Sequence, residues 1–423
     1  MREMKDSGFG WLGKVPANWK VERLQWHLYE INVKNNPIRT TNVLSLTNKK
    51  GVIPYEQKGA QGNISKENYN EYHLAYKDTI VANSMNILIG SVGYSDYYGC
   101  VSPVYYVFKE KEDNDLHFFN YIMQTTQFQR ELRKYANGIL EIRLRVSSDD
   151  ILKRMIAVPK CGEQKRIAAY LDGQCKKIDE IMADIQNQID TLENYKKSVI
   201  SEAVTRGLNP DAAMKDSEIA FVGKIPAHWE LHPVYYYFSE GKIKNTGCTE
   251  NNLLSLSYGN IIRKDINTSE GLLPASFSTY NIVEKDDIII RPTDLQNDKR
   301  SLRTGLVKEK GIITSAYIDL KPKTNVNSRY FHYLLHSYDV KKVFYNMGNG
   351  VRQGLNFGEF SKLSVFNPPI KEQEEIAEYL DSKCAKIDSI IENKKTQLET
   401  IENYKKSLIY EYVTGKKEVP ENE

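Results

Sequence analysis

Cysteine is scarce in this sequence of 423 residues, and its five occurrences have no spacing that suits a disulfide framework or a metal site. The seven histidines are scattered and add no ligand pattern to them. The cysteines are Cys100, Cys161, Cys175, Cys248 and Cys384. We therefore predict a protein of a reducing compartment that holds no structural metal.

An excess of charge of one sign is also missing, since 58 lysines and arginines stand against 55 aspartates and glutamates, a net charge of +3. Such a chain is not a globally basic nucleic-acid binder, so any contact with nucleic acid has to be local. No apolar run approaches the length of a membrane span, and the first residues lack the apolar core of a signal peptide. We expect a cytoplasmic protein without membrane association.

Catalytic motifs are the third absence. No glycine-rich loop that could cradle a phosphate or a cofactor follows a predicted strand. Residues 367–370, Asn-Pro-Pro-Ile, are similar to the Asn-Pro-Pro-aromatic motif of adenine methyltransferases, but isoleucine replaces the aromatic residue. Glu163-Gln164-Lys165, with Asp149 or Asp150, faintly matches a metal nuclease, yet its second copy at Glu372 lacks the lysine. We predict no catalytic residue, no metal site and no cofactor in this chain.

What the sequence does contain is a long internal repeat. Residues 163–207 recur without a gap as residues 372–416, and more than half of the aligned residues are identical. Apolar residues recur every seven positions in both copies, which is typical of a coiled-coil seam. Prolines stand before each copy, and Gly207 and Gly415 lie at the ends. We predict two long helices, a central one at 161–207 and a C-terminal one at 369–416, each roughly 66 Å long at 1.5 Å per residue.

The seven-residue pattern also predicts which side chains join the two helices. The predicted helix-pair and subunit interface consists of Leu171, Ile178, Ile181, Ile185, Leu192, Tyr195, Val199, Leu380, Ile387, Ile390, Ile401, Tyr404 and Leu408.

Shorter motifs show that the rest of the chain is duplicated too. The segment GKVPANW at 13–19 returns as GKIPAHW at 223–229, and strand-like runs at 43–46 and 77–81 return at 253–256 and 285–289. Segments with helical spacing follow in both halves. We predict an α+β protein with two similar mixed domains and two long helices, divided as 1–160, 161–207, 208–368, 369–416 and a polar tail at 417–423.

The two halves differ where loops join equivalent strands, because residues 83–98 bear no resemblance to residues 291–303. Two domains that recognise different targets are expected to share one scaffold and to differ in their loops. Arginine, lysine, asparagine and glutamine can bind base edges and phosphates, although any one of them could be an ordinary solvated loop residue. The candidate DNA-binding residues are Asn48, Lys49, Lys50, Asn83, Ser84, Asn86, Tyr94, Arg143, Arg145, Tyr258, Arg263, Arg291, Thr293, Gln296, Lys299, Arg300, Arg303, Arg352 and Gln353.

The order of these motifs resembles the specificity (S) subunits of type I restriction–modification systems over essentially the whole chain. The most specific segment is PPIKEQEEIAEYLD at 368–381, and its copy CGEQKRIAAYLD at 161–172 lacks the Pro-Pro pair. The resemblance implies a non-catalytic subunit of host defence, in which two target recognition domains are separated by an antiparallel coiled coil with pseudo-twofold symmetry. Each domain would read one half of a bipartite, asymmetric site in double-stranded DNA.

The resemblance also implies the partners. The helix pair would set the spacer between the half-sites and hold two methyltransferase (M) subunits, which use S-adenosylmethionine for DNA methylation. Restriction (R) subunits, which use ATP and Mg, would join in the full complex.

Two other interpretations stay open from the sequence alone. The repeated domains could bind protein, which would make the chain a coiled-coil interaction scaffold, or the chain could hide a nuclease. Salt-dependent DNA binding in the presence of a methyltransferase subunit separates a DNA reader from a scaffold. Metal-dependent cleavage by the chain alone would indicate a nuclease.

Overall fold

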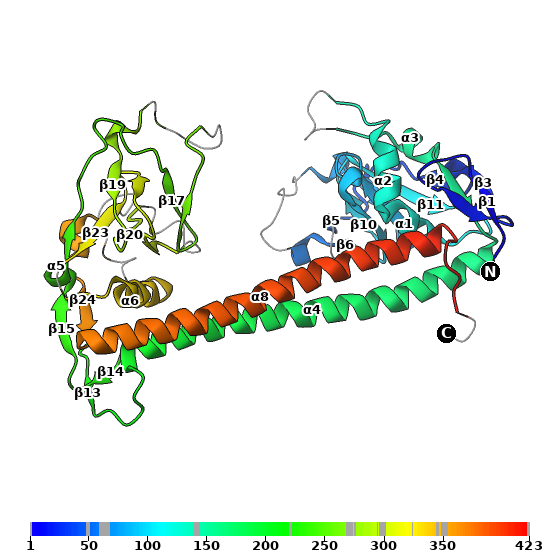
Figure 1. Cartoon of the computed structure of the whole chain (residues 1–423). Helices are drawn as coiled ribbons and strands as arrows, with labels where there is room; N and C mark the ends of the chain where they lie inside the picture. Colours follow the sequence, from blue (N-terminus) through cyan, green and yellow to red (C-terminus); the bar gives the residue numbers. More distant parts are fainter. Residues whose placement is uncertain are drawn as a thin grey trace. The chain divides into compact units, whose positions relative to one another are not determined.

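The computed structural model describes residues 2–47, 51–58, 68–138, 144–219, 222–267, 274, 276–293, 295, 302–323, 325–343, 347 and 354–420. The chain divides into two compact units, described separately below: unit 1 comprises residues 1–186 and 396–423, and unit 2 comprises residues 187–395. Two long helices, α4 (Cys161–Arg206) and α8 (Ile370–Val413), contribute to both units (Figure 1). No helix within these described ranges has the length and apolar character that a bilayer crossing requires.

Unit 1 is built around an antiparallel sheet in the order β4-β11-β8-β9. Two-stranded pairs β1-β2, β3-β12, β5-β6 and β7-β10 surround this sheet. The strands are β1 (Met4–Asp6), β2 (Lys14–Pro16), β3 (Lys20–Arg23), β4 (Leu28–Glu30), β5 (Leu44–Thr47), β6 (Gly51–Pro54), β7 (His73–Ala75), β8 (Thr79–Asn83), β9 (Val92–Ser95), β10 (Gly99–Val101), β11 (Tyr105–Glu110) and β12 (Met155–Val158). The short helices are α1 (Leu116–Gln124), α2 (Thr126–Arg133) and α3 (Ser148–Leu152).

Unit 2 repeats this plan with the sheet order β16-β23-β20-β21 and the pairs β13-β14, β15-β24, β17-β18 and β19-β22. The strands are β13 (Met214–Asp216), β14 (Lys224–Pro226), β15 (Glu230–Pro233), β16 (Phe238–Glu240), β17 (Leu254–Ser257), β18 (Asn260–Arg263), β19 (Asn281–Val283), β20 (Ile288–Ile290), β21 (Thr304–Leu306), β22 (Gly311–Ile313), β23 (Ile318–Pro322) and β24 (Ser364–Asn367). The short helices are α5 (Val234–Tyr237), α6 (Ser328–Val340) and α7 (Phe357–Phe360).

In each unit one short helix joins the sheet to the long helices. Phe118 and Phe119 of α1 share a buried core with the sheet and with Leu171 of α4 and Leu408 of α8. The equivalent helix of unit 2, α6, packs in the same way, and Figure 1 shows it between the sheet and the long helices. The core of each unit therefore fixes the sheet, and the loops at its edge, onto the helix pair.

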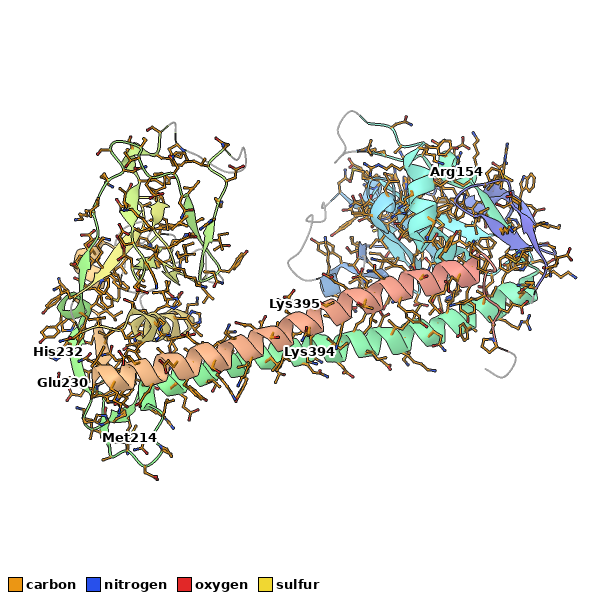
Figure 2. The ribbon with its side chains drawn as sticks, viewed as in Figure 1. Arg154, Met214, Glu230, His232, Lys394 and Lys395 are labelled. Atoms are coloured by element: carbon orange, nitrogen blue, oxygen red, sulfur yellow. The ribbon has the colours of Figure 1, made fainter. Side chains whose placement is uncertain are left out.

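The long helices run antiparallel within each unit, because the first part of one pairs with the last part of the other. In unit 1 Lys405 donates from Nζ to Asp179 at 2.6 Å, and in unit 2 Lys196 donates to Asp388 at 2.6 Å. These four residues are repeat equivalents, since 179 and 196 each become 388 and 405 on adding 209. Lys394, labelled in Figure 2, donates to Gln188 at 2.5 Å.

The seam between the helices differs in part from the sequence prediction. Leu171, Ile178, Ile185, Val199, Leu380, Ile387 and Leu408 are buried as expected, and Leu192 and Ile401 are half-buried. Ile181, Tyr195, Ile390 and Tyr404 are exposed, so they lie outside the helix–helix seam and only the subunit part of the prediction remains for them. Each seven-residue repeat has a second position that faces the partner helix. In this structure it lies four residues after the first one rather than three, so the buried residues are Cys175, Ile189, Cys384 and Ile391.

The repeated Glu-Gln pair at the start of each long helix has a structural role. Glu163 accepts the indole N–H of Trp19 at 3.2 Å, and Glu372 accepts that of Trp229 at 3.1 Å. Gln164 accepts the backbone N–H of Asp115, the N-cap residue of α1, at 2.8 Å. Its repeat Gln373 does the same for Asn327, the N-cap residue of α6, at 3.0 Å. In each unit the Glu-Gln pair thus fixes the tryptophan of the repeated segment at 13–19 or 223–229. It also fixes the start of the short helix, α1 or α6, that joins the sheet to the long helices.

Unit 2 has a buried acidic cluster that has no counterpart among the described residues of unit 1. The carboxyls of Asp287 and Asp319 are 4% and 1% exposed, and Lys321 reaches them at 2.7 and 3.8 Å. In the matching strand register, unit 1 has Val107 in place of Asp319. Burial, followed by the neighbouring charge of Asp287, raises the pKa of Asp319 to about 7.

This cluster predicts that unit 2 loses stability as the pH rises from about 4 to about 7. The unfolded Asp319 ionises near its ordinary pKa of about 4, whereas the folded carboxyl keeps its proton up to about 7. The stability is therefore fully present below the unfolded pKa and is lost through the folded one, by up to about 4 kcal/mol over the whole span and by roughly 2–3 kcal/mol between pH 5 and pH 8. Denaturant unfolding at pH 5 and pH 8 measures the loss. An Asp319→Asn variant should flatten the profile; an equal slope in that variant would contradict the assignment.

Candidate nucleic-acid interface

In unit 2 the β17–β18 hairpin lies against the end of the loop that joins β20 to β21. This loop, residues 291–303, is called the variable loop below. Gly305, in β21 just after that loop, lies so close to the hairpin that a side-chain carbon there would come within 2.6 Å of Leu256 and 2.9 Å of Ile261. At the hairpin tip, a carbon added to Gly259 would lie 3.1 Å from Leu302, the last residue of the loop before Arg303. The hairpin tip and the returning end of the loop therefore belong to one surface.

The hairpin turns through two residues, Tyr258 and Gly259, whose φ angles are +44° and +81°. Positive φ at both central residues is the signature of a type I′ turn, which matches the right-handed twist of the paired strands. The turn holds Tyr258 at the tip, where it is 75% exposed. The exposed polar residues Asn260 and Arg263 follow on β18.

Arg263 is exposed and forms an ion pair with Glu309, to which it donates from both Nε and a terminal nitrogen. The bond from Arg263 lowers the pKa of Glu309, so this carboxylate stays ionised. Arg291 is half-buried at the start of the variable loop, and its backbone N–H donates to the carbonyl of Arg303 at 2.8 Å. The side chain of Thr293 is half-buried nearby. Arg263 is thus an exposed cation at the end of β18 away from the hairpin tip, and it is paired with Glu309.

Arg303 needs a correction, because its side chain is fully buried. Its guanidinium donates to the backbone carbonyl of Thr293, and its backbone N–H donates to the carboxylate of Asp339 on α6. An arginine enclosed in this way cannot lie against a phosphate or a base edge in the described conformation. Its place in the polar segment 291–303 between two predicted strands had suggested a DNA contact; the structure gives it the role of anchoring the loop.

In unit 1 the predicted DNA contacts of Asn83 and Ser84, at the end of β8, do not fit the structure either. Asn83 and Ser84 are 6% and 3% exposed. Asn83 accepts the backbone N–H of Met85 through its side chain at 3.0 Å, and the carbonyl of Ser84 accepts the N–H of Val146 at 3.0 Å. These two residues therefore shape the loop from inside rather than facing a ligand.

Three predicted residues of unit 1 reach the surface at least in part. Asn86 and Arg145 are exposed. Tyr94 is half-buried, with its ring centroid 4.0 Å from that of His117 and its hydroxyl donating to Asp78. Burial, and then this bond, raises the pKa of the Tyr94 hydroxyl well above its ordinary value.

Ile89 is a surface residue that the sequence reasoning missed. It is 66% exposed on the loop after β8, at the last position of a short 3-10 helix (Ile87–Ile89). The apolar run Ile87-Leu88-Ile89 directly before a glycine could have suggested a shaped loop with one outward apolar residue. Its place beside Asn86 adds an apolar element to the candidate surface of unit 1.

Nine predicted residues fall outside the described ranges, so their candidacy rests on the sequence. They are Asn48, Lys49, Lys50, Arg143, Gln296, Lys299, Arg300, Arg352 and Gln353. Within the part of the chain that the structure describes, no three His, Cys, Asp or Glu side chains are placed to share a metal ion.

Comparison with known proteins decides the family. The family model described as type I restriction modification DNA specificity domain matches residues 16–191 and 238–402, one match in each half and together most of the chain. The chain belongs to this family. As a type I specificity subunit it is a non-catalytic component of a restriction–modification system, and the predicted fold of two similar mixed domains with two long helices is confirmed.

Relatives of this specificity subunit match it along nearly its whole length. The type I restriction enzyme MjaVIII specificity subunit of Methanocaldococcus jannaschii is 25% identical over 431 residues, which covers 95% of this chain and 94% of the relative. The sequence assigned as the MjaX specificity subunit of the same organism is 23% identical over 440 residues, covering 96% and 95%.

A solved structure supports the fold independently. It is described as the structural basis of complex assembly and conformational transition of the type I R-M system, and one of its chains has a TM-score of 0.68 to this specificity subunit. The match covers 94% of this chain and 98% of that chain at 12% identity. At this identity the likeness concerns the fold alone.

Proposed function

We propose that this specificity subunit reads a bipartite, asymmetric site in double-stranded DNA, with one unit for each half-site. The observation that carries the proposal is the contrast between scaffold and loops. The sheet orders β4-β11-β8-β9 and β16-β23-β20-β21 are equivalent, whereas the loops after β8 and β20 differ in length and sequence. Two readers with one scaffold and different loops would recognise two different sequences.

The exposed side chains of the helix pair support docking of two equal partners. Ile181 and Tyr404 are 49% and 54% exposed in unit 1, and their repeat equivalents Ile390 and Tyr195 are 45% and 47% exposed in unit 2. Each unit thus offers the same apolar pair outside the helix–helix seam. We propose that these pairs bind two methyltransferase subunits, which carry S-adenosylmethionine, and that the length of the helix pair sets the spacer between the half-sites.

The remaining assignments follow the same proposal. Restriction subunits with ATP and Mg would complete the assembly, and the complex would act on DNA in the cytoplasm. The alternative function is an interaction scaffold whose repeated domains bind protein and not DNA, and the experiment has to separate the two.

The test combines this chain with the methyltransferase subunit of its own system. We expect adenine methylation at one split sequence, mapped on genomic DNA, with no methyl transfer by the chain alone. Size-exclusion analysis should give two methyltransferase subunits for each chain. Assembly without sequence-specific methylation would favour a protein scaffold instead.

Surface variants then assign each half-site to a unit. Arg145→Ala should weaken recognition of one half-site and Arg263→Ala the other. A contact to a base costs about 1–3 kcal/mol and relaxes specificity at its position, whereas a contact to a phosphate weakens all sequences alike and lowers the salt slope by about one. Lys153→Ala is a matched control, because Lys153 is an exposed cation that is paired with Asp149 on α3 and does not belong to either variable loop, 83–98 or 291–303.

A further inference from the structure

Tyr258 is the most exposed large apolar or aromatic side chain among the described residues, at 75%. Ordinary folding does not favour an aromatic ring at such a place, because most of its surface stays in water. The exposure is therefore better explained by something that the ring meets outside the chain.

The backbone of Tyr258 strengthens this argument. Its φ of +44° lies in the left-handed region, where asparagine, aspartate and glycine are favoured and tyrosine is uncommon. Asparagine would serve the type I′ turn better, so the tyrosine is not there for the turn. Residues held in unfavourable backbone conformations cluster at functional sites.

The surroundings of Tyr258 point to a nucleic acid. The tip lies beside the returning end of the variable loop, through the contact of Gly259 with Leu302. Asn260, which is exposed, follows the tip on β18. Arg263 is exposed at the other end of this strand, where it is paired with Glu309. Both side chains carry donors of the kind that bind the sugar–phosphate backbone. Asn260 donates its side-chain N–H to the carbonyl of Tyr258 at 3.5 Å. A ring on a convex two-residue tip, with donors behind it, is shaped to enter a stack of bases rather than to line a pocket.

We propose that Tyr258 is a specificity-determining wedge that inserts its ring between adjacent base pairs of the half-site read by unit 2. Side chains inserted in this way unstack one base step and kink the duplex, and they favour steps that unstack easily. The ring would thus read deformability at a step that no hydrogen bond contacts. This inference rests on the proposed DNA-reading function.

The experiment uses the complex of the full chain with its methyltransferase subunits and a duplex that carries the mapped site. 2-Aminopurine, placed in turn at each position of the half-site, brightens where its base loses its stacking partner. The variants are Tyr258→Phe, which keeps the ring, and Tyr258→Ala and Tyr258→Asn, which remove it. Tyr235→Ala is the control, because Tyr235 is an exposed tyrosine on α5 of the same unit, 51% exposed.

A methyltransferase flips its target base out of the stack, so 2-aminopurine at a target adenine brightens with every variant. With the wild-type chain and with Tyr258→Phe, we expect additional brightening at one step of the half-site read by unit 2. Tyr258→Ala and Tyr258→Asn should lose the signal and about tenfold in affinity, as expected for a lost aromatic–base stack. Tyr258→Asn should unfold at the same temperature as the wild type or higher, which separates the loss of the ring from a loss of fold. Tyr235→Ala should behave as wild type.

Unchanged brightening and affinity in the alanine and asparagine variants would overturn the wedge while leaving DNA reading intact. A loss of methyltransferase assembly in these variants without DNA would assign the ring to a protein contact instead. If the wild-type complex binds no mapped site at all, the proposed function fails and the wedge fails with it.

Discussion

Replacing Trp229 by alanine should destabilise unit 2 by about 3–5 kcal/mol, the range for truncating a large buried aromatic side chain. Trp229 is fully buried, packs against Tyr330 and Phe366, and donates its indole N–H to Glu372 at the start of α8. Alanine would leave a cavity and a carboxylate without this donor. Denaturant unfolding followed by far-UV circular dichroism measures the change, and methylation should become indifferent to one half-site.

Trp19→Ala is the mirrored experiment, because Trp19 is the repeat equivalent in unit 1 and donates to Glu163. This variant should lower the free energy of unfolding by a similar amount, and methylation should become indifferent to the other half-site. Trp26→Ala is the surface control, since Trp26 is 55% exposed, and should change stability by less than about 0.5 kcal/mol. Equal stability of the Trp229 and Trp26 variants would refute the role of the indole at the helix start.

Replacing Arg303 should reduce stability rather than the salt dependence of DNA binding. Arg303→Ala removes a buried guanidinium that donates to the carbonyl of Thr293, and unsatisfied buried polar groups cost about 1–3 kcal/mol each. We expect a total loss of roughly 2–4 kcal/mol once the lost packing is included. Arg303→Met keeps most of the volume without the donors, so it should fall between the alanine variant and the wild type.

The measurement that separates the two roles is the salt dependence of binding to the mapped site. A lysine or arginine on a phosphate contributes about one unit to the slope of log affinity against log salt. At a temperature where Arg303→Met is fully folded, its slope should equal that of the wild type. A slope lower by one, with unchanged stability, would return Arg303 to the DNA-contact set.

The duplication and the helix pair could be predicted from the sequence because they rest on strong periodic signals. A seven-residue repeat identifies one set of seam positions without ambiguity, and those residues are buried, except Leu192 and Ile401, which are half-buried. The same repeat leaves the companion position open, since both three and four residues onward lie near the seam. Packing selects the fourth, which is why Cys175 and Ile189 are inside and Ile181 and Tyr195 are outside.

The candidate site was harder to predict because residue type does not reveal direction. Arg303 and Arg263 are both arginines near predicted strands, but one is enclosed by α6 and the variable loop while the other is exposed. The burial of Asn83 and Ser84 depends on contacts with Met85 and Val146, and Val146 lies more than 60 residues away. Such long-range closures leave no local pattern in the sequence.

The discontinuity of unit 1 has a consequence for how the protein is made. Its core includes Leu408, Ile409, Tyr412 and Val413 from the end of the chain, and Tyr410 and Lys416 donate to the carbonyls of Trp11 and Leu12. Unit 2, by contrast, is one continuous stretch, residues 187–395. At about 5–20 residues per second, roughly 10–40 s of translation separate the two parts of unit 1. The unit that is synthesised first is therefore completed last. The apolar surface of unit 1 that packs against the end of α8 stays uncovered until that helix has been synthesised.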